Sequence, residues 1–346
     1  MLLVSPGTTA GWRKVDTQLA ALLRDLGLSV AVATSEFRIA RHLRRTVALT
    51  DLVEAAAMRR ATTRALRRHR PRAIVYSSTQ ATMLQPRARL AHAGVRFDAL
   101  TTENRPGRSN ALQHLLERRA LRRVAVLLPS GLDPARRVPE RLLHELKVVG
   151  LPIPIRPVSD AQPREPIVVT YAGNPDKKGL DRIARAWQSA PPAGRRLVVT
   201  GIDAERGRGF LRARGVSEPD GIEWAGRLDP ERHQALLASA EAFVSASRYE
   251  DYGLAQLEAL AAGTPLVTTE SDGPYEALPL ARSLEPALVA GNATPETLAI
   301  ALRAALQMPA PARYAYAERA RELLAPHSEQ ELQRRVEEEV LPLLLD

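Results

Sequence analysis

Short apolar runs alternate along the chain with longer segments in which apolar residues recur at helical spacing. Segments such as WRKVDTQLAALLRDL (12–26) place their apolar side chains on one helical face and end at a glycine, here Gly27. Strands that alternate with helices form parallel sheets covered on both faces, so the pattern predicts an α/β fold. The runs with the length and composition of buried strands are LLVS (2–5), LSVAVAT (28–34), AIVYS (73–77), VRFDALTT (95–102), VAVLLPS (124–130), IVVTYAG (167–173), RLVVTG (196–201), GIEWAG (221–226), AFVSAS (242–247) and PLVTT (265–269).

A proline-rich segment separates these runs into two series of similar size. Prolines stand at 152, 154, 157, 163 and 166, which predicts a stiff, extended linker over residues 151–166. We therefore expect two doubly wound domains, at 1–150 and 167–327. The remaining segment, 328–346, has the pattern of a terminal helix.

The segment 243–269 is the most informative about function. It reads FVSASRYEDYGLAQLEALAAGTPLVTT, in which an apolar strand, a turn at Gly253, a helix and a second strand follow one another. A helix N-terminus at the end of a parallel strand presents unpaired N–H groups that suit phosphates. Glu250 precedes this terminus and Glu258 lies within the helix. The two carboxylates are therefore candidates to bracket a diphosphate and to accept hydrogen bonds from sugar hydroxyls.

The full pattern, S-x-x-E-x-Y-G-L-x-x-x-E-A-L-A-x-G-x-P-L-V, resembles the signature of family-4 retaining glycosyltransferases. The resemblance implies the GT-B fold, in which two Rossmann-like domains face a cleft and the last helix crosses back to the first domain. It further implies a nucleoside-diphosphate sugar, UDP- or GDP-linked, in the second domain, a hydroxyl acceptor in the first, and no metal. The alternative interpretation is an ordinary amphipathic helix with solvated glutamates.

The resemblance also implies roles for single residues of this segment. Glu250 would orient the hydroxyls of the donor sugar, and Glu258 would bind the ribose. The backbone amides of Gly253 and Leu254 would bind phosphate or sugar oxygens. Tyr252 stands where the family usually has Phe, and it belongs to the same expected donor site.

A second motif lies in YAGNPDKKGLDRIARAW (171–187). It is similar to the family's G-R-x-x-x-x-K-G motif, whose lysine and arginine hold the donor diphosphate. Lys178 matches the lysine, whereas Asn174 occupies the arginine position. A departing diphosphate gathers negative charge, so another cation is needed in place of that arginine. The candidates are Lys177, Arg105 and Arg108.

Two further positions complete the expected donor site. Arg227, in GIEWAGRLDP, lies where the family wraps the nucleobase, and a guanidinium can stack on such a ring or pair with a phosphate. A surface arginine is the alternative. Gly7, in SPGTTAGW, lies at a strand-to-helix turn, the place of a glycine-rich loop in GT-B enzymes.

Composition narrows the class of protein. The 346 residues are 45% hydrophobic, enough for two buried cores, and the absence of cysteine excludes disulfides and thiolate metal sites. The seven histidines lack the H-x-x-x-H and H-E-x-x-H spacings of zinc sites. No stretch approaches the ~18 apolar residues of a membrane span. We therefore predict a cytoplasmic protein without a metal cofactor.

Positive charge is concentrated in the first half of the chain. Residues 1–150 hold 27 Lys and Arg against 11 Asp and Glu, a net charge of +16, whereas the remainder carries −6. Arginines interleave with apolar residues at near-helical spacing in 37–49, 58–72 and 117–123. Such helices bind nucleic acid or an anionic membrane, which would place the protein at the inner membrane face. An arginine-rich solvated surface is the alternative.

Three functions follow from these patterns. The motifs favour a retaining glycosyltransferase with a hydroxyl acceptor that is lipid-linked or a glycan. A sugar-nucleotide epimerase on the same fold would instead turn over the donor without an acceptor. A non-enzymatic nucleic-acid-binding protein is suggested only by the basic half. Aromatic residues, at 4%, are few for base stacking, so no stable nucleic-acid partner is expected.

Overall fold

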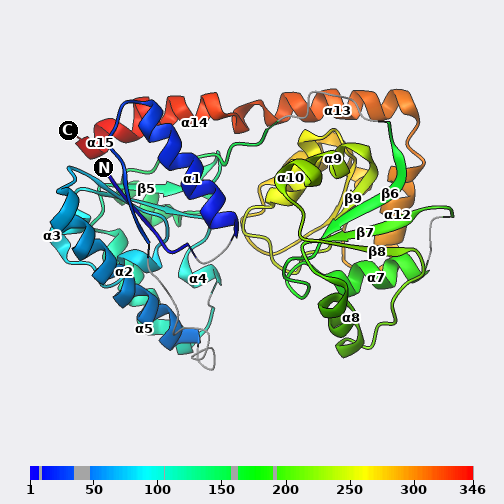
Figure 1. Cartoon of the computed structure of the whole chain (residues 1–346), viewed down its shortest axis with the longest axis horizontal. Coiled ribbons are helices and arrows are strands. Elements are labelled where there is room, and N and C mark those ends of the chain that lie inside the picture. The colour runs from blue at the N-terminus through cyan, green and yellow to red at the C-terminus, as the bar shows by residue number, and fades with distance from the viewer. Residues whose placement is uncertain (8–9, 35–46, 105, 157–162, 190–192, 346) are drawn as a thin grey trace. The chain divides into compact units, whose positions relative to one another are not determined.

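The chain forms two α/β units, each with its own sheet (Figure 1). Unit 1 comprises Met1–Pro154 together with Glu329–Asp346, and unit 2 comprises Ile155–Ser328. The computed structural model describes residues 1–7, 10–34, 47–104, 106–156, 163–189 and 193–345.

Unit 1 is built on a five-stranded sheet of order β2-β1-β3-β4-β5, in which every neighbouring pair is parallel. Its strands are β1 (Leu2–Ser5), β2 (Ala31–Thr34), β3 (Ile74–Tyr76), β4 (Ala93–Phe97) and β5 (Val126–Pro129). The helices between and after them are α1 (Ala10–Asp25), α2 (Val47–His69), α3 (Arg87–Leu90), α4 (Thr101–Asn104), α5 (Ala111–Leu121) and α6 (Glu140–Glu145).

Both faces of this sheet are buried. On β1, Leu2 and Val4 belong to one apolar cluster and Leu3 belongs to another. Met58 of α2 packs in the first cluster, and Leu23 of α1 packs in the second. A strand covered on both faces has no polar side, which is why these strands appear in the sequence as short continuous apolar runs.

The end of the chain completes the second of these clusters. It forms α14 (Glu329–Arg335), a π-helical turn (Val336–Val340) and α15 (Leu341–Leu345), which lie beside α1 in Figure 1. The terminal helix predicted for this segment thus belongs to unit 1. The side chains that it buries there are Leu332, Val336, Val340 and Leu344.

Unit 2 holds a six-stranded sheet of order β11-β10-β9-β6-β7-β8, and all of its pairs are parallel. Its strands are β6 (Glu165–Tyr171), β7 (Arg196–Thr200), β8 (Ile222–Gly226), β9 (Ala240–Val244), β10 (Leu266–Thr269) and β11 (Val289–Ala290). Its helices are α7 (Leu180–Ser189), α8 (Ala204–Ala213), α9 (Pro230–Ser239), α10 (Leu254–Ala261), α11 (Ala277–Leu284), α12 (Pro295–Leu306) and α13 (Ala310–Leu324).

The strand order of unit 2 reverses its direction between β6 and β9. From β6 the chain adds β7 and β8 on one side, and it then returns to add β9 on the other, where Val168 pairs with Ala242. Sheets of this kind bind ligands outside the carboxyl ends of the two strands at such a switch point. The loops that follow β6 and β9 therefore lie where this architecture places a ligand.

Every apolar run predicted as a strand overlaps one, and the predicted α/β class is confirmed. The run 95–102 was too long, because β4 ends at Phe97 and α4 begins at Thr101. The two-residue strand β11 was not predicted. Both ends of the predicted linker belong to the units, because Leu151 N donates to the carbonyl oxygen of Pro129 at 2.9 Å and Glu165 begins β6. Residues 157–162 of that segment, and 37–46 of the first basic segment, lie outside the described residues.

None of the described helices combines the length and apolar composition that a membrane-crossing segment requires.

Substitution of Leu332 tests the packing of the chain end on unit 1. Leu332→Ala should lower the free energy of unfolding by about 2–5 kcal/mol, because it leaves a cavity among buried side chains. Gln333→Ala, at an exposed position of the same helix, is the control and should change it by less than about 0.5 kcal/mol. Urea unfolding followed by circular dichroism measures both, and equal effects would contradict the packing.

Candidate functional site

Two loops meet at the carboxyl edge of the second sheet. One joins β6 to α7 through residues 172–179, and the other joins β9 to α10 through residues 245–253. Gly179, at φ +67°, sets how closely they approach, since a Cβ atom there would lie 2.0 Å from the carbonyl oxygen of Ala246. No side chain fits between the loops at this point.

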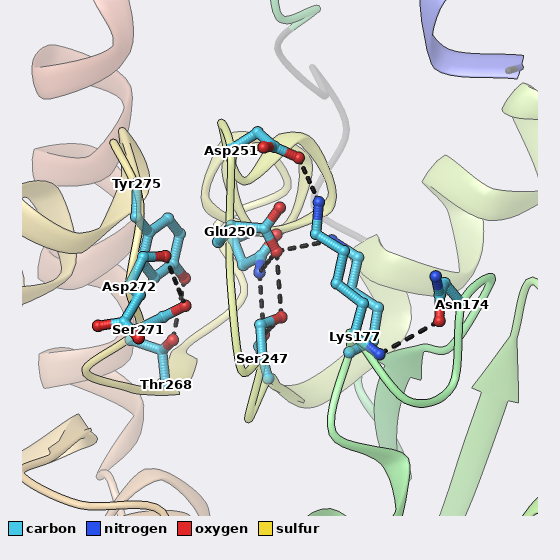
Figure 2. A network of polar contacts seen from close by, with 12 residues as sticks. Asn174, Lys177, Ser247, Glu250, Asp251, Thr268, Ser271, Asp272 and Tyr275 are labelled. Carbon is cyan, nitrogen blue, oxygen red and sulfur yellow. Dashed lines mark hydrogen bonds and ion pairs between the residues drawn. The ribbon is translucent and has the colours of Figure 1, made fainter. Parts of the chain in front are cut away.

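A buried ion pair joins the two loops. Lys178 Nζ lies 2.6 Å from Glu250 Oε2, and the two side chains are 15% and 5% exposed. Ser247 Oγ and Gln256 Nε2 donate to the same oxygen at 3.1 and 3.0 Å, and Figure 2 shows Ser247 directed at Glu250. Three donors thus converge on Oε2, and within the described part of the chain none donates to Oε1.

This environment sets the charge of Glu250. Burial raises the pKa of the carboxyl, but the charge of Lys178 and the hydrogen bonds from Lys178 and Gln256 outweigh burial and hold the pKa below its usual range. Glu250 is therefore ionised at neutral pH. Removing one partner of a buried pair costs about 3–5 kcal/mol, because the other charge stays buried. The pair is a fixed part of unit 2.

A second ion pair lies beside the first and is more exposed. Lys177 Nζ contacts Asp251 Oδ2, and the side chains are 32% and 25% exposed. Figure 2 shows Lys177 extending from the first loop to Asp251 on the second. The ammonium also lies 5.4 Å from the centre of the Tyr249 ring. Ion pairs this accessible typically contribute only about 0–1 kcal/mol.

The side chain of Asn174 is part of the first loop. Its Oδ1 accepts a hydrogen bond from Lys177 N at 3.2 Å, and its carbonyl oxygen accepts one from Lys178 N at 2.9 Å (Figure 2). Asn174 shapes the turn that presents the two lysines. It adds no positive charge where the resembling motif has arginine.

The helix α10 begins at this edge without a side-chain cap. Its N-cap is Gly253, at φ +89°, and no side chain of the described residues accepts from its first turn. The side chains of Asp203, Asp229 and Thr294 cap α8, α9 and α12. The N–H groups that open a helix have no acceptor inside it. Those of Leu254 and its neighbours are therefore available to a ligand, at the positive end of the helix dipole.

Glycine at position 253 is required by packing as well as by its backbone conformation. A Cβ atom there would lie 2.5 Å from Tyr275 Cε2. Tyr275 is buried, and its hydroxyl lies 2.9 Å from Thr268 Oγ1 (Figure 2). The ring of Tyr275 thus fixes the backbone at the start of α10.

Glu258 and Tyr252 differ in their access to a ligand. Glu258 Oε2 lies 3.8 Å from His233 Nε2 on α9, and the Glu258 side chain is 25% exposed. Tyr252 is buried, and its hydroxyl lies 3.3 Å from His327 Nδ1. Glu258 therefore opens to solvent, whereas a ligand would meet Tyr252 through its backbone.

Tyr171, which the sequence analysis did not single out, ends β6 beside the ion pair. Its ring lies 5.9 Å from Lys178 Nζ, and glycines make room for it: a Cβ atom at Gly201 would lie 2.6 Å from Tyr171 Cε2. Burial raises the pKa of Tyr171, and the charge of Arg227 acts in the opposite direction. Arg227 thus lies within electrostatic reach of this ring. An aromatic residue at the end of a predicted strand, just before a glycine turn, is the sequence signal that could have identified it.

The other predicted positions belong to unit 1 or lie outside the described residues. Gly7, at φ +60°, lies in the turn after β1, where its N–H donates to Ser5 Oγ at 3.2 Å. Arg108 begins a 3₁₀ turn before α5, and Arg105 is not among the described residues. Roles for Gly7 and Arg108 at the site in unit 2 stay predictions.

Among the described residues, no group of three or more His, Cys, Asp or Glu side chains is arranged to hold a metal ion.

Comparison with known proteins gives a match in the second unit. Residues 154–323 match the family model for glycosyl transferases group 1. This segment is similar to glycosyl transferases of group 1. Lys178, Glu250 and Glu258 all fall within the matched segment, which occupies just under half of the chain.

Sequence similarity also extends to glycogen synthases. The chain is 36% identical to a glycogen synthase of Mycobacterium tuberculosis over 190 residues, which cover 49% of this chain and 42% of that protein. It is 36% identical to a glycogen synthase of Thermus thermophilus over 110 residues, 31% of this chain and 25% of that protein. The chain thus spans less than half the length of these relatives.

Similarity to solved structures covers both units. A sucrose-phosphate synthase from Thermosynechococcus elongatus has a TM-score of 0.71 at 18% identity, over 96% of this chain and 95% of that one. WaaG, a glycosyltransferase involved in lipopolysaccharide biosynthesis, has a TM-score of 0.69 at 17% identity, over 99% and 98%. These likenesses confirm the predicted GT-B fold.

Unfolding across pH tests the ionised state of Glu250. Its pKa in the folded protein lies below the unfolded value of about 4.3, so its contribution to stability is complete above that value and is lost as the pH falls through the folded pKa. Wild-type protein should therefore be more stable than Glu250→Gln at pH 7, and this advantage should shrink below about pH 4. Urea unfolding at pH 7, 5 and 3 measures the difference in stability between the two proteins. A difference that is the same at all three pH values would contradict the ionised state of Glu250.

Proposed function

We propose that the protein is a retaining glycosyltransferase that moves a sugar from a nucleoside-diphosphate donor, UDP- or GDP-linked, to a hydroxyl acceptor. The observation that carries the proposal is the Lys178–Glu250 ion pair buried beside the uncapped N-terminus of α10. It combines a cation, amide donors and a carboxylate, the groups that a diphosphate and a sugar require. The match of residues 154–323 to group 1 glycosyltransferases supports the same assignment.

The diphosphate binds at the start of α10 in this proposal. Amide groups of Gly253 and Leu254 donate to its oxygens, and the ammonium of Lys178 lies on the adjacent loop. Charge accumulates on the diphosphate as it departs, and fixed donors stabilise that charge without having to reorganise. Lys178 and the helix dipole therefore favour departure of the leaving group more than they favour binding.

The donor sugar lies against Glu250. Because Lys178, Ser247 and Gln256 all donate to Oε2, the other carboxylate oxygen is the acceptor for a sugar hydroxyl. The negative charge of Glu250 also faces the positive charge that develops at the anomeric carbon.

The nucleoside lies along α10 and the end of β8. Glu258 is half-buried and accepts hydrogen bonds from the ribose hydroxyls, a common role of carboxylates in nucleotide sites. Arg227 follows β8, is exposed, and stacks on the base plane.

The reaction needs no nucleophile from the protein. The acceptor oxygen bonds to the anomeric carbon while the bond from that carbon to the diphosphate oxygen breaks. The nucleoside diphosphate leaves with the electron pair, and its oxygen takes the acceptor's proton on the same face, so that the configuration is retained. The protein contributes position and charge.

We further propose that unit 1 binds the acceptor at an anionic membrane surface. Leu112 and Leu115 of α5 are 54% and 51% exposed, and the next turn of that helix carries exposed Arg118 and Arg119. Exposed leucines among arginines allow a helix to lie on a bilayer, with its apolar side chains inserted and its charges at the head groups. This arrangement favours a lipid-linked acceptor.

Substitution of Glu250 separates binding from transfer. Glu250→Gln keeps the shape of the side chain, and Glu250 is proposed to meet the sugar and not the nucleotide. The variant should therefore bind UDP or GDP nearly as wild type does and should lose turnover by about 100-fold or more. Glu258→Ala is the matched variant, and it should weaken nucleoside-diphosphate binding by about 1.5–3 kcal/mol. Calorimetry with UDP, GDP and ADP measures binding. Release of the nucleoside diphosphate from the corresponding nucleotide sugar measures turnover. Full turnover of Glu250→Gln, or no diphosphate binding by wild type, would contradict the proposal.

Vesicle co-sedimentation tests the membrane surface. Wild-type protein should bind vesicles that contain anionic lipid, and binding should fall as added salt shortens the Debye length below ~10 Å. The double substitution Leu112→Ser and Leu115→Ser should weaken it. Ile300→Ser, at a 63% exposed position of α12 in unit 2, is the control. Equal binding to neutral vesicles, or no binding to anionic ones, would contradict the proposed membrane surface. The arginines would then be solvated surface residues.

A further inference from the structure

The two lysines of the first loop are held in different ways. Lys178 pairs with Glu250 among buried groups, with side chains 15% and 5% exposed, whereas Lys177 and Asp251 are 32% and 25% exposed. The Lys177–Asp251 pair is part-buried but more accessible to water than the Lys178–Glu250 pair, so water replaces its lost contacts at lower cost. The Lys177 ammonium can therefore exchange its partner, whereas that of Lys178 is held by its surroundings.

Lys177 also lies close to the start of α10. Its carbonyl oxygen accepts a hydrogen bond from Arg248 N at 2.9 Å, which ties its backbone to the second loop. Its ammonium contacts Asp251, two residues before the N-cap Gly253. The Lys177 ammonium thus lies against the loop that leads directly into α10.

A nucleoside diphosphate at this site needs a second cation. Asn174 of the same loop is neutral, and its Oδ1 accepts a hydrogen bond from Lys177 N at 3.2 Å. A diphosphate has more negative charge than one lysine and a helix dipole compensate.

We propose that Lys177 is the second diphosphate-binding cation of this site, and that Asp251, which its ammonium contacts, competes with the diphosphate for it. The inference rests on the proposed function, since it assumes a nucleoside diphosphate at α10. On binding, the ammonium of Lys177 leaves the carboxylate and donates to a phosphate oxygen. The Tyr249 ring, 5.4 Å from the ammonium, supports the side chain where it contacts Asp251. Asp251 therefore competes with the ligand for Lys177.

This competition gives opposite effects at the two positions. Lys177→Met should weaken the binding of UDP or GDP about tenfold or more, because it removes a charged donor to phosphate. Asp251→Asn should tighten binding several-fold, because it removes the internal competitor and a like charge. Lys177→Arg retains the charge and should retain most of the affinity. The corresponding free nucleoside, uridine or guanosine, lacks phosphates and should bind all variants alike.

The experiment is calorimetric titration of each variant with UDP, GDP and their nucleosides at two salt concentrations. Arg303→Met and Glu296→Gln, exposed charges on α12, are matched controls that should leave affinity unchanged. The salt dependence of diphosphate binding should be less steep for Lys177→Met, since one ionic contact is missing. Urea unfolding of each variant accompanies the titrations, and a loss of diphosphate affinity together with equal loss of nucleoside affinity would assign Lys177 a structural role.

Two results separate the inference from the proposed function. If wild type binds a nucleoside diphosphate and Lys177→Met binds it equally well, the inference is wrong and the proposed function stands. If Asp251→Asn weakens diphosphate binding, Asp251 is not a competitor, and the inference is likewise wrong. If wild type binds none of UDP, GDP and ADP, both are overturned.

Discussion

Two opposite charges buried together make the two loops of unit 2 fold as one piece. Lys178 and Glu250 are 72 positions apart in the chain, and each is costly to bury without the other. Their pairing requires the loops to approach so closely that only glycine fits at position 179. The start of α10, the turn closed by Asn174 and the second ion pair all take their positions from this contact. The chemistry proposed for the site therefore depends on it.

The fold was predictable because parallel strands buried on both faces leave a strong pattern. Each appears as a short apolar run, and the turns that follow β6 and β9 contain the glycines that close approach demands. The strand β11 was missed because Val289–Ala290 is too short to produce any pattern. The ends of the linker are hard to place from sequence, because prolines at 152 and 166 are compatible with both an extended connection and the margins of a sheet.

The site was predictable only in part. Lys178, Glu250 and Glu258 were found from local spacing, and the structure brings Lys178 and Glu250 into contact. Pairing between residues distant in sequence leaves no local signal, so the contact of Lys177 with Asp251 required the structure. Tyr252 shows the reverse case. Its position in the motif suggested a ligand contact, but the hydroxyl that distinguishes it from Phe has a buried partner in His327. The roles assigned to all of these residues stay predictions.

The last helices of the chain complete unit 1, although they follow unit 2 in the sequence. Unit 2 is continuous in sequence, so a nascent chain can complete it once residue 328 has emerged from the ribosome. Unit 1 begins first, yet one face of its sheet waits for Leu332, Val336, Val340 and Leu344, the side chains that cover Leu3 and its neighbours. Domains usually mature in the order of their synthesis. Here the N-terminal unit is the last to have all of its residues synthesised, because the side chains that cover this face follow unit 2 in the sequence.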